Sequence, residues 1–207
     1  MSSRDAGTVG GKRITLALTG ASGIVFGQRM LLALDRDPRV CRVDLVPSEN
    51  SLRVLAEEMR WSGRTALVEK LLGGPSAKTH QHAESDIGAG IASGSFPSDG
   101  MVVLPCSMGT LAGIANGLAE NLIERAADVA LKEGRPLILC VRETPFNKIH
   151  LRNMTLAADA GAVIFPVIPS FYNQPADITA MADQFACRVL ARLGLPQPGA
   201  YVWKGQE

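Results

Sequence analysis

Residues 14–34, ITLALTGASGIVFGQRMLLAL, decide the fold class of this chain. The first five residues are nearly all apolar, as expected of a strand that is buried on both faces. A glycine turn follows at residues 19–23, and apolar residues then recur at helical spacing over residues 25–34. The segment therefore predicts a strand, a tight turn and a helix.

The same strand-to-helix plan recurs along the 207 residues. Apolar runs predict further strands over residues 40–46, 101–104, 137–141 and 162–165. Helical spacing predicts helices over residues 48–59, 111–118, 122–133, 149–160 and 178–193. This alternation indicates an α/β fold with a parallel sheet of at least five strands and right-handed crossovers. No linker divides the chain, so we expect one domain over residues 13–195, with a flexible tail at 1–12 and a C-terminal tail at 196–207.

Composition excludes several classes of function. The chain has 21 basic and 20 acidic residues, so its net charge is +1. This is not the excess of positive charge expected of a protein that binds nucleic acid or an anionic membrane. The N-terminal residues lack the apolar core of a signal peptide, and no apolar run approaches the length of a membrane span, so we expect a cytoplasmic protein. The four cysteines form no CxxC pair, and three lie in apolar patterns, which favours buried thiols in a reducing compartment.

The glycine-rich segment of residues 73–100 is too long for a routine connection, and such a loop is usually functional or mobile. It contains His80 and His82, a pair too small to specify a metal ion without a carboxylate or thiolate partner. A solvated loop is the favoured interpretation of these histidines. We expect no metal site.

Two turns offer backbone amides to an anion. The first, at residues 20–27, opens a helix whose N-terminus favours a phosphate, although it does not match the GxGxxG fingerprint. Glu49 could bind a ribose there, but Ser48 and the glycine spacing fit a mononucleotide better. The second, at residues 106–110, should follow a neighbouring strand and line the same crevice, unless Ser107 or Thr110 only caps the helix.

Arg142 and Glu143 directly follow the apolar run of residues 137–141, where open α/β sheets place their chemistry. From the pair alone, a surface salt bridge and a functional site are equally good interpretations.

Three further basic residues have two interpretations each. Arg125 and Lys132 lie on one side of a helix among acidic residues, and the pattern alone favours a solvated, salt-bridged face. Arg188, flanked by core positions, requires a carboxylate of its own chain or an anion, which could be a ligand of a neighbouring subunit. Tyr172 either packs in its loop or binds a phosphate oxygen.

Six segments, in this order and spacing, closely resemble the UbiX-type flavin prenyltransferases. They are residues 18–23 (LTGASG), 93–96 (SGSF), 104–111 (LPCSMGTL), 124–133 (ERAADVALKE), 141–145 (VRETP) and 169–175 (PSFYNQP). The resemblance implies a flavodoxin-like (Rossmann-like) three-layer sandwich and no metal. It also implies reduced FMN as prenyl acceptor and dimethylallyl phosphate as donor, in a homododecamer with sites between subunits. The product, prenylated FMN, serves UbiD-type decarboxylases.

The resemblance also assigns site residues. To FMN it assigns Gly20, Ala21, Ser22, Ser48, Cys106, Ser107, Met108, Gly109 and Arg142. It assigns Tyr172 and Arg188 to the donor phosphate, adds Arg125 and Lys132 as basic residues, and so replaces the solvated-face interpretation. Glu58 and Glu143 are the acids, and Glu143 and Ser22 are expected to move protons during ring closure. Phe26 stands where many members carry Tyr, which puts one local hydroxyl contact in doubt.

Two rival functions make different demands on these residues. The cysteine-decarboxylating flavoproteins carry a Pro-x-Met-Asn element and a catalytic histidine, whereas this chain has the residues FYNQP from 171 and no fitting histidine. An electron carrier that holds FMN would have no use for Arg188 or Glu143.

Overall fold

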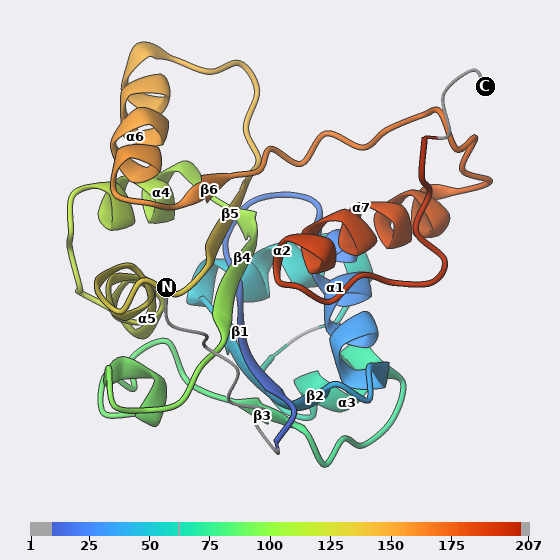
Figure 1. Ribbon diagram of the computed structural model, residues 1–207, viewed down its shortest axis with the longest axis horizontal. Helices are drawn as coiled ribbons and strands as arrows, with labels where there is room; N and C mark the ends of the chain where they lie inside the picture. Colours follow the sequence, from blue (N-terminus) through green and yellow to red (C-terminus); the bar gives the residue numbers. More distant parts are fainter. Residues whose placement is uncertain (1–9, 62, 204–207) are drawn as a thin grey trace, which may run out of the picture.

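A parallel sheet forms the centre of the computed structural model, which describes residues 10–61 and 63–203 (Figure 1). The strands are β1 (Lys12–Leu18), β2 (Val40–Pro47), β3 (Thr79–Gln81), β4 (Gly100–Cys106), β5 (Leu137–Val141) and β6 (Val163–Ile164). The α-helices are α1 (Ile24–Arg36), α2 (Glu49–Met59), α3 (Leu67–Leu72), α4 (Met108–Ala115), α5 (Leu122–Lys132), α6 (Lys148–Asp159) and α7 (Ile178–Arg192), and η1 (Gly90–Ala92) is a 3₁₀ helix.

The strand order is β3-β2-β1-β4-β5-β6, and every described pairing is parallel. The five strands that the sequence predicts follow the flavodoxin order 2-1-3-4-5, and the short β3 extends that sheet at one edge. The order reverses between β1 and β4. Ligands of open α/β sheets bind at this point, beyond the carboxyl ends of the strands.

Helices cover both faces of the sheet, as predicted for a three-layer sandwich. Buried side chains of α1, α2, α3 and α7 form one core with the sheet, and those of α4, α5 and α6 form the other (Figure 1). In the first core, Phe185 packs edge-to-face against Phe26 and against Phe165, with ring centroids 5.3 Å apart in each pair. None of the described helices is long and apolar enough to cross a membrane.

The prediction of a solvated loop at the histidine pair is wrong. His80 lies in β3, where it pairs with Asp44 of β2, and Nε2 of His82 lies 2.8 Å from Oδ1 of Asp44. Arg42 also binds the Asp44 carboxylate, which is buried. A buried carboxylate requires such partners, and the sequence does not show that the residue directly after β3 will supply one.

The segment of residues 73–100 is likewise more structured than a single long loop, because it contains β3 and η1. The sequence pattern also missed α3. Elements of three to six residues are too short to show a hydrophobic period, which explains both omissions.

β1 begins at Lys12, and residues 195–203 pass along α7 without forming a helix or strand. Most of the predicted N-terminal tail, residues 1–9, and residues 204–207 lie outside the described part of the chain.

The four cysteines differ in burial. Cys106 and Cys140 are buried, Cys187 is partly buried and Cys41 is exposed.

Candidate functional site

Thr19 joins the two turns that follow β1 and β4. Its hydroxyl donates to the carbonyl of Pro105 over 2.7 Å and accepts from the backbone amide of Ser107 over 2.8 Å. Thr19 was not among the predicted site residues, because its partners lie 86 and 88 residues away along the chain. The one feature of the sequence that could have indicated Thr19 is its position directly after a predicted strand. The predicted adjacency of the two turns is therefore confirmed.

The turn after β1 requires glycine at its first position. A Cβ atom on Gly20 would lie 2.5 Å from Cβ of Asn50, which is the second residue of α2. Only glycine fits so close an approach. Ala21 is buried in this turn, and Ser22 is exposed at its tip. The tight contact therefore holds the turn after β1 against the N-terminal end of α2.

Glu58 occupies the N-terminus of α1. Its carboxylate accepts from the backbone amide of Gly23 over 2.9 and 3.1 Å, and from that of Ile24 over 2.9 Å. A carboxylate is stabilised there by the helix dipole, as a phosphate would be. The sequence predicts a phosphate at these amides, and the structure places a residue of the chain on them instead.

The N-terminus of α4 is the more open of the two. Ser107 caps the helix, since its Oγ accepts from the amide of Thr110 over 3.3 Å. The capping interpretation is thus correct, and it leaves Met108 and Gly109 at the helix N-terminus. Apart from its chain neighbours and the backbone of its own helix, no described atom lies within 4 Å of the position that a Cβ on Gly109 would occupy. Free amides, a helix dipole and open space together suit an anion.

Cys106 contributes to this turn through its backbone. Its side chain is fully buried, and burial raises the pKa of its thiol to about 12, so the sulfur stays neutral. Its carbonyl accepts from the backbone amide of Arg142 over 3.1 Å, which ties the end of β5 to the second turn.

Ser48 and Glu49 lie at the same edge of the sheet, after β2. Ser48 caps α2 as predicted, with Oγ accepting from the amide of Ser51 over 3.0 Å, and its own amide donates to the carbonyl of Leu18 over 2.9 Å. Glu49 forms an ion pair with Arg64. Glu49 is therefore engaged within the chain, which disfavours the ribose-binding alternative.

Arg142 and Glu143 do not form a salt bridge with each other. Both are exposed, Glu143 accepts from the amide of Thr144 over 2.9 Å, and no carboxylate of the described residues pairs with Arg142. The salt-bridge interpretation of this pair is wrong. An unpaired guanidinium beside an open helix N-terminus is suited to a phosphate.

Arg188 and Tyr172 lie together at a second place. With Ser170, Tyr201 and Trp203 they line a pocket of about 390 Å³. The guanidinium carbon of Arg188 lies 5.7 Å from the ring centroid of Phe165, and none of the described residues offers it a carboxylate. The rings of Tyr172 and Trp203 meet edge-to-face at 5.4 Å. The pocket combines one free cation with an aromatic wall.

The structure does not bring Arg125 and Lys132 to these residues. Arg125 pairs with Asp128 at 2.7 Å and Lys132 with Glu133 at 2.7 Å, as the solvated-face interpretation predicts. Helix α5 runs back from the carboxyl end of β4 and ends at Lys132, shortly before β5 begins. Lys132 therefore lies at the opposite end of the sheet from Arg142 within one chain.

Comparison with known proteins decides between the families. The Flavoprotein family model matches residues 2–186. The flavin prenyltransferase UbiX of Salmonella typhimurium is 44% identical over 189 residues, which are 90% of this chain and 94% of that protein. The chain belongs to the UbiX-type flavin prenyltransferases.

Solved structures of this family match the whole fold. The crystal structure of AnUbiX (PadA1) in complex with FMN and dimethylallyl pyrophosphate has a TM-score of 0.85 and 41% identity, and covers 95% of this chain and 100% of that one. A dodecameric FMN-dependent UbiX-like decarboxylase from Escherichia coli O157:H7 has a TM-score of 0.83 and 40% identity, with coverage of 93% and 100%. The flavodoxin-like three-layer fold expected of a UbiX-type flavin prenyltransferase is confirmed.

The residues at the carboxyl end of the sheet fit FMN, the cofactor of the UbiX-type enzymes. The N-terminus of α4 is open beside Gly109, and Arg142 carries a positive charge without a partner among the described residues. A flavin phosphate requires such donors.

Proposed function

We propose that this chain transfers a dimethylallyl group from dimethylallyl phosphate to N5 and C6 of reduced FMN and releases prenylated FMN. The observation that carries the proposal is the pocket of Tyr172 and Arg188, where a cation without a described carboxylate partner faces an aromatic wall. A phosphate ester with a short apolar chain matches both features. An electron carrier would not require either.

The proposed FMN site follows the turns at the carboxyl ends of β1, β2, β4 and β5. The amides of Met108 and Gly109 and the guanidinium of Arg142 would bind the phosphate, and Ser107, whose own amide donates to Thr19, would hold the start of α4 in place. Gly20, Ala21, Ser22 and Ser48 would shape the side of the site next to α1 and α2, while Cys106 acts through its backbone. Glu58 fixes the first turn by holding the amides of Gly23 and Ile24.

The donor side of the site must promote cleavage of a C–O bond without a metal. Reduced FMN supplies the nucleophile when it is bound. As the bond breaks, the electron pair remains on the phosphate, whose growing charge is stabilised by preorganised cations and donors. Arg188 and the phenol of Tyr172 have these roles in our proposal, together with Lys132 and Arg125.

Ring closure requires the removal of one proton and the delivery of another. Glu143 and Ser22 are the proposed proton carriers, because both are exposed beside the turns at this edge of the sheet. The Glu143 carboxylate is held by the amide of Thr144.

A second copy of the chain completes the site in this proposal, and we propose a homododecamer. Lys132 lies at the opposite end of the sheet from Arg142 within one chain, so it can serve the reaction only from a neighbouring subunit, and we assign Arg125 of the same helix to that neighbour as well. Large apolar side chains that are exposed on the single chain suit such contacts. They include Ile149, Leu151 and Leu156 on α6, and Ile168 and Phe171 in the loop before α7.

We also propose a cytoplasmic location and a UbiD-type decarboxylase as the recipient of the product. The free cysteines among the described residues suit a reducing compartment. The recipient follows from family membership, because prenylated FMN is the cofactor that such decarboxylases use.

Mass spectrometry of the flavin tests the reaction. The protein is incubated with reduced FMN and dimethylallyl phosphate, and the released flavin is weighed. A gain of one prenyl unit supports the proposal, and the Glu143→Gln variant should bind FMN yet fail to complete the product. Unmodified flavin that cycles reversibly between redox states would support the electron carrier, and decarboxylation of a peptide with a C-terminal cysteine would support the rival enzyme.

A further inference from the structure

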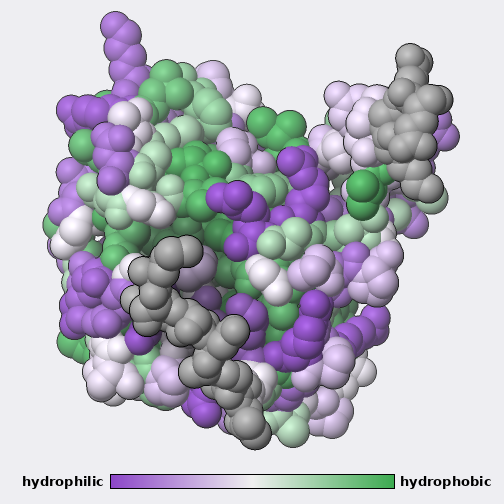
Figure 2. Space-filling model, viewed as in Figure 1, coloured by the Kyte–Doolittle hydropathy of each residue, from purple (hydrophilic) through white to green (hydrophobic). Residues whose placement is uncertain are grey.

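The C-terminal segment reverses direction after α7 and runs back along that helix. It starts beside the C-terminal end of α7, and residues 199–203 reach the loop that precedes α7 and carries Tyr172 (Figure 1). This part of the molecule stands out from the body at the upper right of the space-filling view (Figure 2). The segment thereby places Tyr201 and Trp203 in the wall of the Arg188 pocket.

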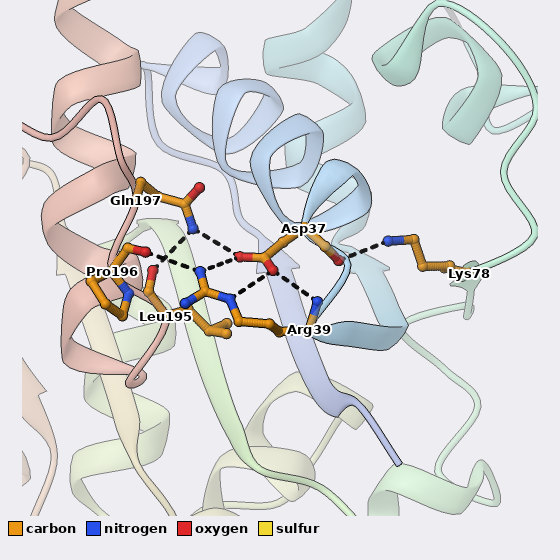
Figure 3. Close-up of polar contacts among 6 residues, drawn as sticks. All are labelled: Asp37, Arg39, Lys78, Leu195, Pro196 and Gln197. Carbon is orange, nitrogen blue, oxygen red and sulfur yellow. Dashed lines mark hydrogen bonds and ion pairs between the residues drawn. The ribbon is translucent and has the colours of Figure 1, made fainter. Parts of the chain in front are cut away.

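The start of this segment, at Pro196 and Gln197, is fixed by an ionic cluster around the buried carboxylate of Asp37 (Figure 3). Nε2 of Gln197 donates to Oδ2 of Asp37 over 2.9 Å, and Nη2 of Arg39 donates to the carbonyl of Pro196 over 3.0 Å. Arg39 also pairs with Asp37 at 2.6 Å. The side-chain hydrogen bond from Arg39 holds the pKa of Asp37 well below its ordinary value, so this carboxylate stays charged.

Residues 199–201 of the segment are held in place by Gln184, which projects from α7. Its Nε2 donates to the carbonyl of Gly199 over 2.9 Å, and its Oε1 accepts from the amide of Tyr201 over 2.9 Å. One side-chain amide thus pairs with both sides of the backbone, as a neighbouring strand would. Both polar groups of Gln184 are used on the segment.

Apolar burial does little to hold the end of the segment. Val202 and Trp203 are 70% and 67% exposed, and the described contact of Trp203 is its ring pair with Tyr172. The last anchor before these residues along the chain is the pair of hydrogen bonds to Gln184. Loss of that anchor should release the wall while leaving α7 and its buried face intact.

We propose that Gln184 is a positioning residue, which holds the C-terminal segment so that Tyr201 and Trp203 form the apolar wall of the donor pocket. Arg188 then binds the phosphate of the donor and the aromatic wall binds its short apolar chain. The inference rests on the proposed function, because it assigns the pocket to the prenyl donor. Gln184 itself does not line this pocket.

Fluorescence of Trp203 tests the anchor directly. The chain has two tryptophans, so a Trp61→Phe background leaves Trp203 as the only one. In that background, Gln184→Ala should lower the anisotropy of Trp203 without changing the midpoint of urea unfolding. Gln28→Ala is the matched control, because Gln28 also bonds a backbone carbonyl, that of Leu71, but lies away from the segment.

Kinetics test the role in donor binding. Gln184→Ala should raise the KM for dimethylallyl phosphate about tenfold and change kcat less than twofold, as expected for the loss of two hydrogen bonds that position a binding wall. Gln184→Glu keeps the acceptor for Tyr201 but sets an acceptor oxygen against the carbonyl of Gly199, so its KM should also exceed that of wild type.

Two outcomes would contradict the proposed role of Gln184. Unchanged Trp203 anisotropy in Gln184→Ala would show that this residue is not the anchor, and lower anisotropy with an unchanged KM would show that the segment does not serve the donor. Donor binding is also followed separately, by titrating dimethylallyl phosphate into the FMN complex. Binding that Gln184→Ala weakens, in a protein that does not prenylate FMN, would overturn the proposed function and support the assignment of the pocket.

Discussion

The carboxylate of Glu58 on α2 accepts the backbone amide of Gly23 at the start of α1, over 2.9 and 3.1 Å. Gly23 has a positive φ of 105°, so the chain turns sharply at the point that Glu58 holds. This contact joins the first two helices at the edge of the sheet where the proposed FMN site lies. It also gives Glu58 a structural role that its place in a helix does not reveal.

Substitution of Glu58 should therefore weaken flavin binding by loosening the first turn. We expect Glu58→Ala to raise the Kd for FMN about fivefold to thirtyfold, the range for removing a charged acceptor from one or two amides. Titration of FMN fluorescence measures this. Glu57→Ala is the control, because Glu57 is exposed and its neighbouring position on α2 gives it no described contact with the turn. Equal Kd values for the two variants would contradict the role.

Thr19 should contribute to stability, because it connects the two turns through buried polar groups. Thr19→Val keeps the shape but leaves the carbonyl of Pro105 and the amide of Ser107 without this partner. We expect a loss of about 1–3 kcal/mol in the free energy of unfolding, measured with urea. In Thr155→Val, which removes an exposed hydroxyl bonded to the carbonyl of Leu151 on α6, the change should stay within about 0.5 kcal/mol.

Arg142 should bind the flavin phosphate through its charge. We expect Arg142→Ala to raise the Kd for FMN about tenfold to a hundredfold, with a smaller increase for Arg142→Lys, because lysine keeps the charge but not the planar fork. Arg152→Ala removes an exposed arginine on α6 and serves as the control. A similar Kd for riboflavin and FMN in wild type would argue against a phosphate site.

Asp44 should make stability depend on acid pH. Burial alone would raise the pKa of Asp44, but hydrogen bonds from His82 and Arg42 outweigh it, so the pKa lies below the ordinary 3.8. A carboxylate with a lowered pKa stabilises the fold above its unfolded pKa, and this stabilisation is lost as the pH falls through its folded pKa.

Urea unfolding of Asp44→Asn measures this contribution. The variant should be about 2–4 kcal/mol less stable than wild type at neutral pH, as expected when a buried ion pair loses its charge. The difference should shrink once the pH falls below about 3.8. Asp159→Asn, at the exposed end of α6, should show no such pH dependence. A constant difference for Asp44→Asn down to pH 3 would contradict the assignment.

Mixing of inactive variants should reveal shared sites. If one subunit supplies Arg142 and its neighbour Lys132, then coassembly of Arg142→Ala with Lys132→Ala restores wild-type residues at about one quarter of the sites. Prenylated FMN formed by the mixture, with each variant alone as control, measures this. No activity after unfolding and refolding together would mean that both residues serve the same subunit's site.

Much of the fold could be predicted from the sequence because its signals are local. The apolar runs, the glycine turn at residues 19–23 and the caps at Ser48 and Ser107 all depend on neighbours within a few residues. The sequence also predicted that the two turns are adjacent, because ligands of open α/β sheets bind where neighbouring strands end. The short β3 and α3 gave no comparable signal.

The sequence by itself determined the α/β class, the polar turns at the ends of the strands and, through six ordered segments, the family. Only the tertiary structure decided the partner of each charge. It placed Glu58 on the amides of α1, left Arg142 and Arg188 without described carboxylates and separated Lys132 from both. Periodicity depends on neighbours along the chain, whereas charge pairing depends on residues that folding brings together. Thr19 and Pro105, 86 residues apart, illustrate the difference.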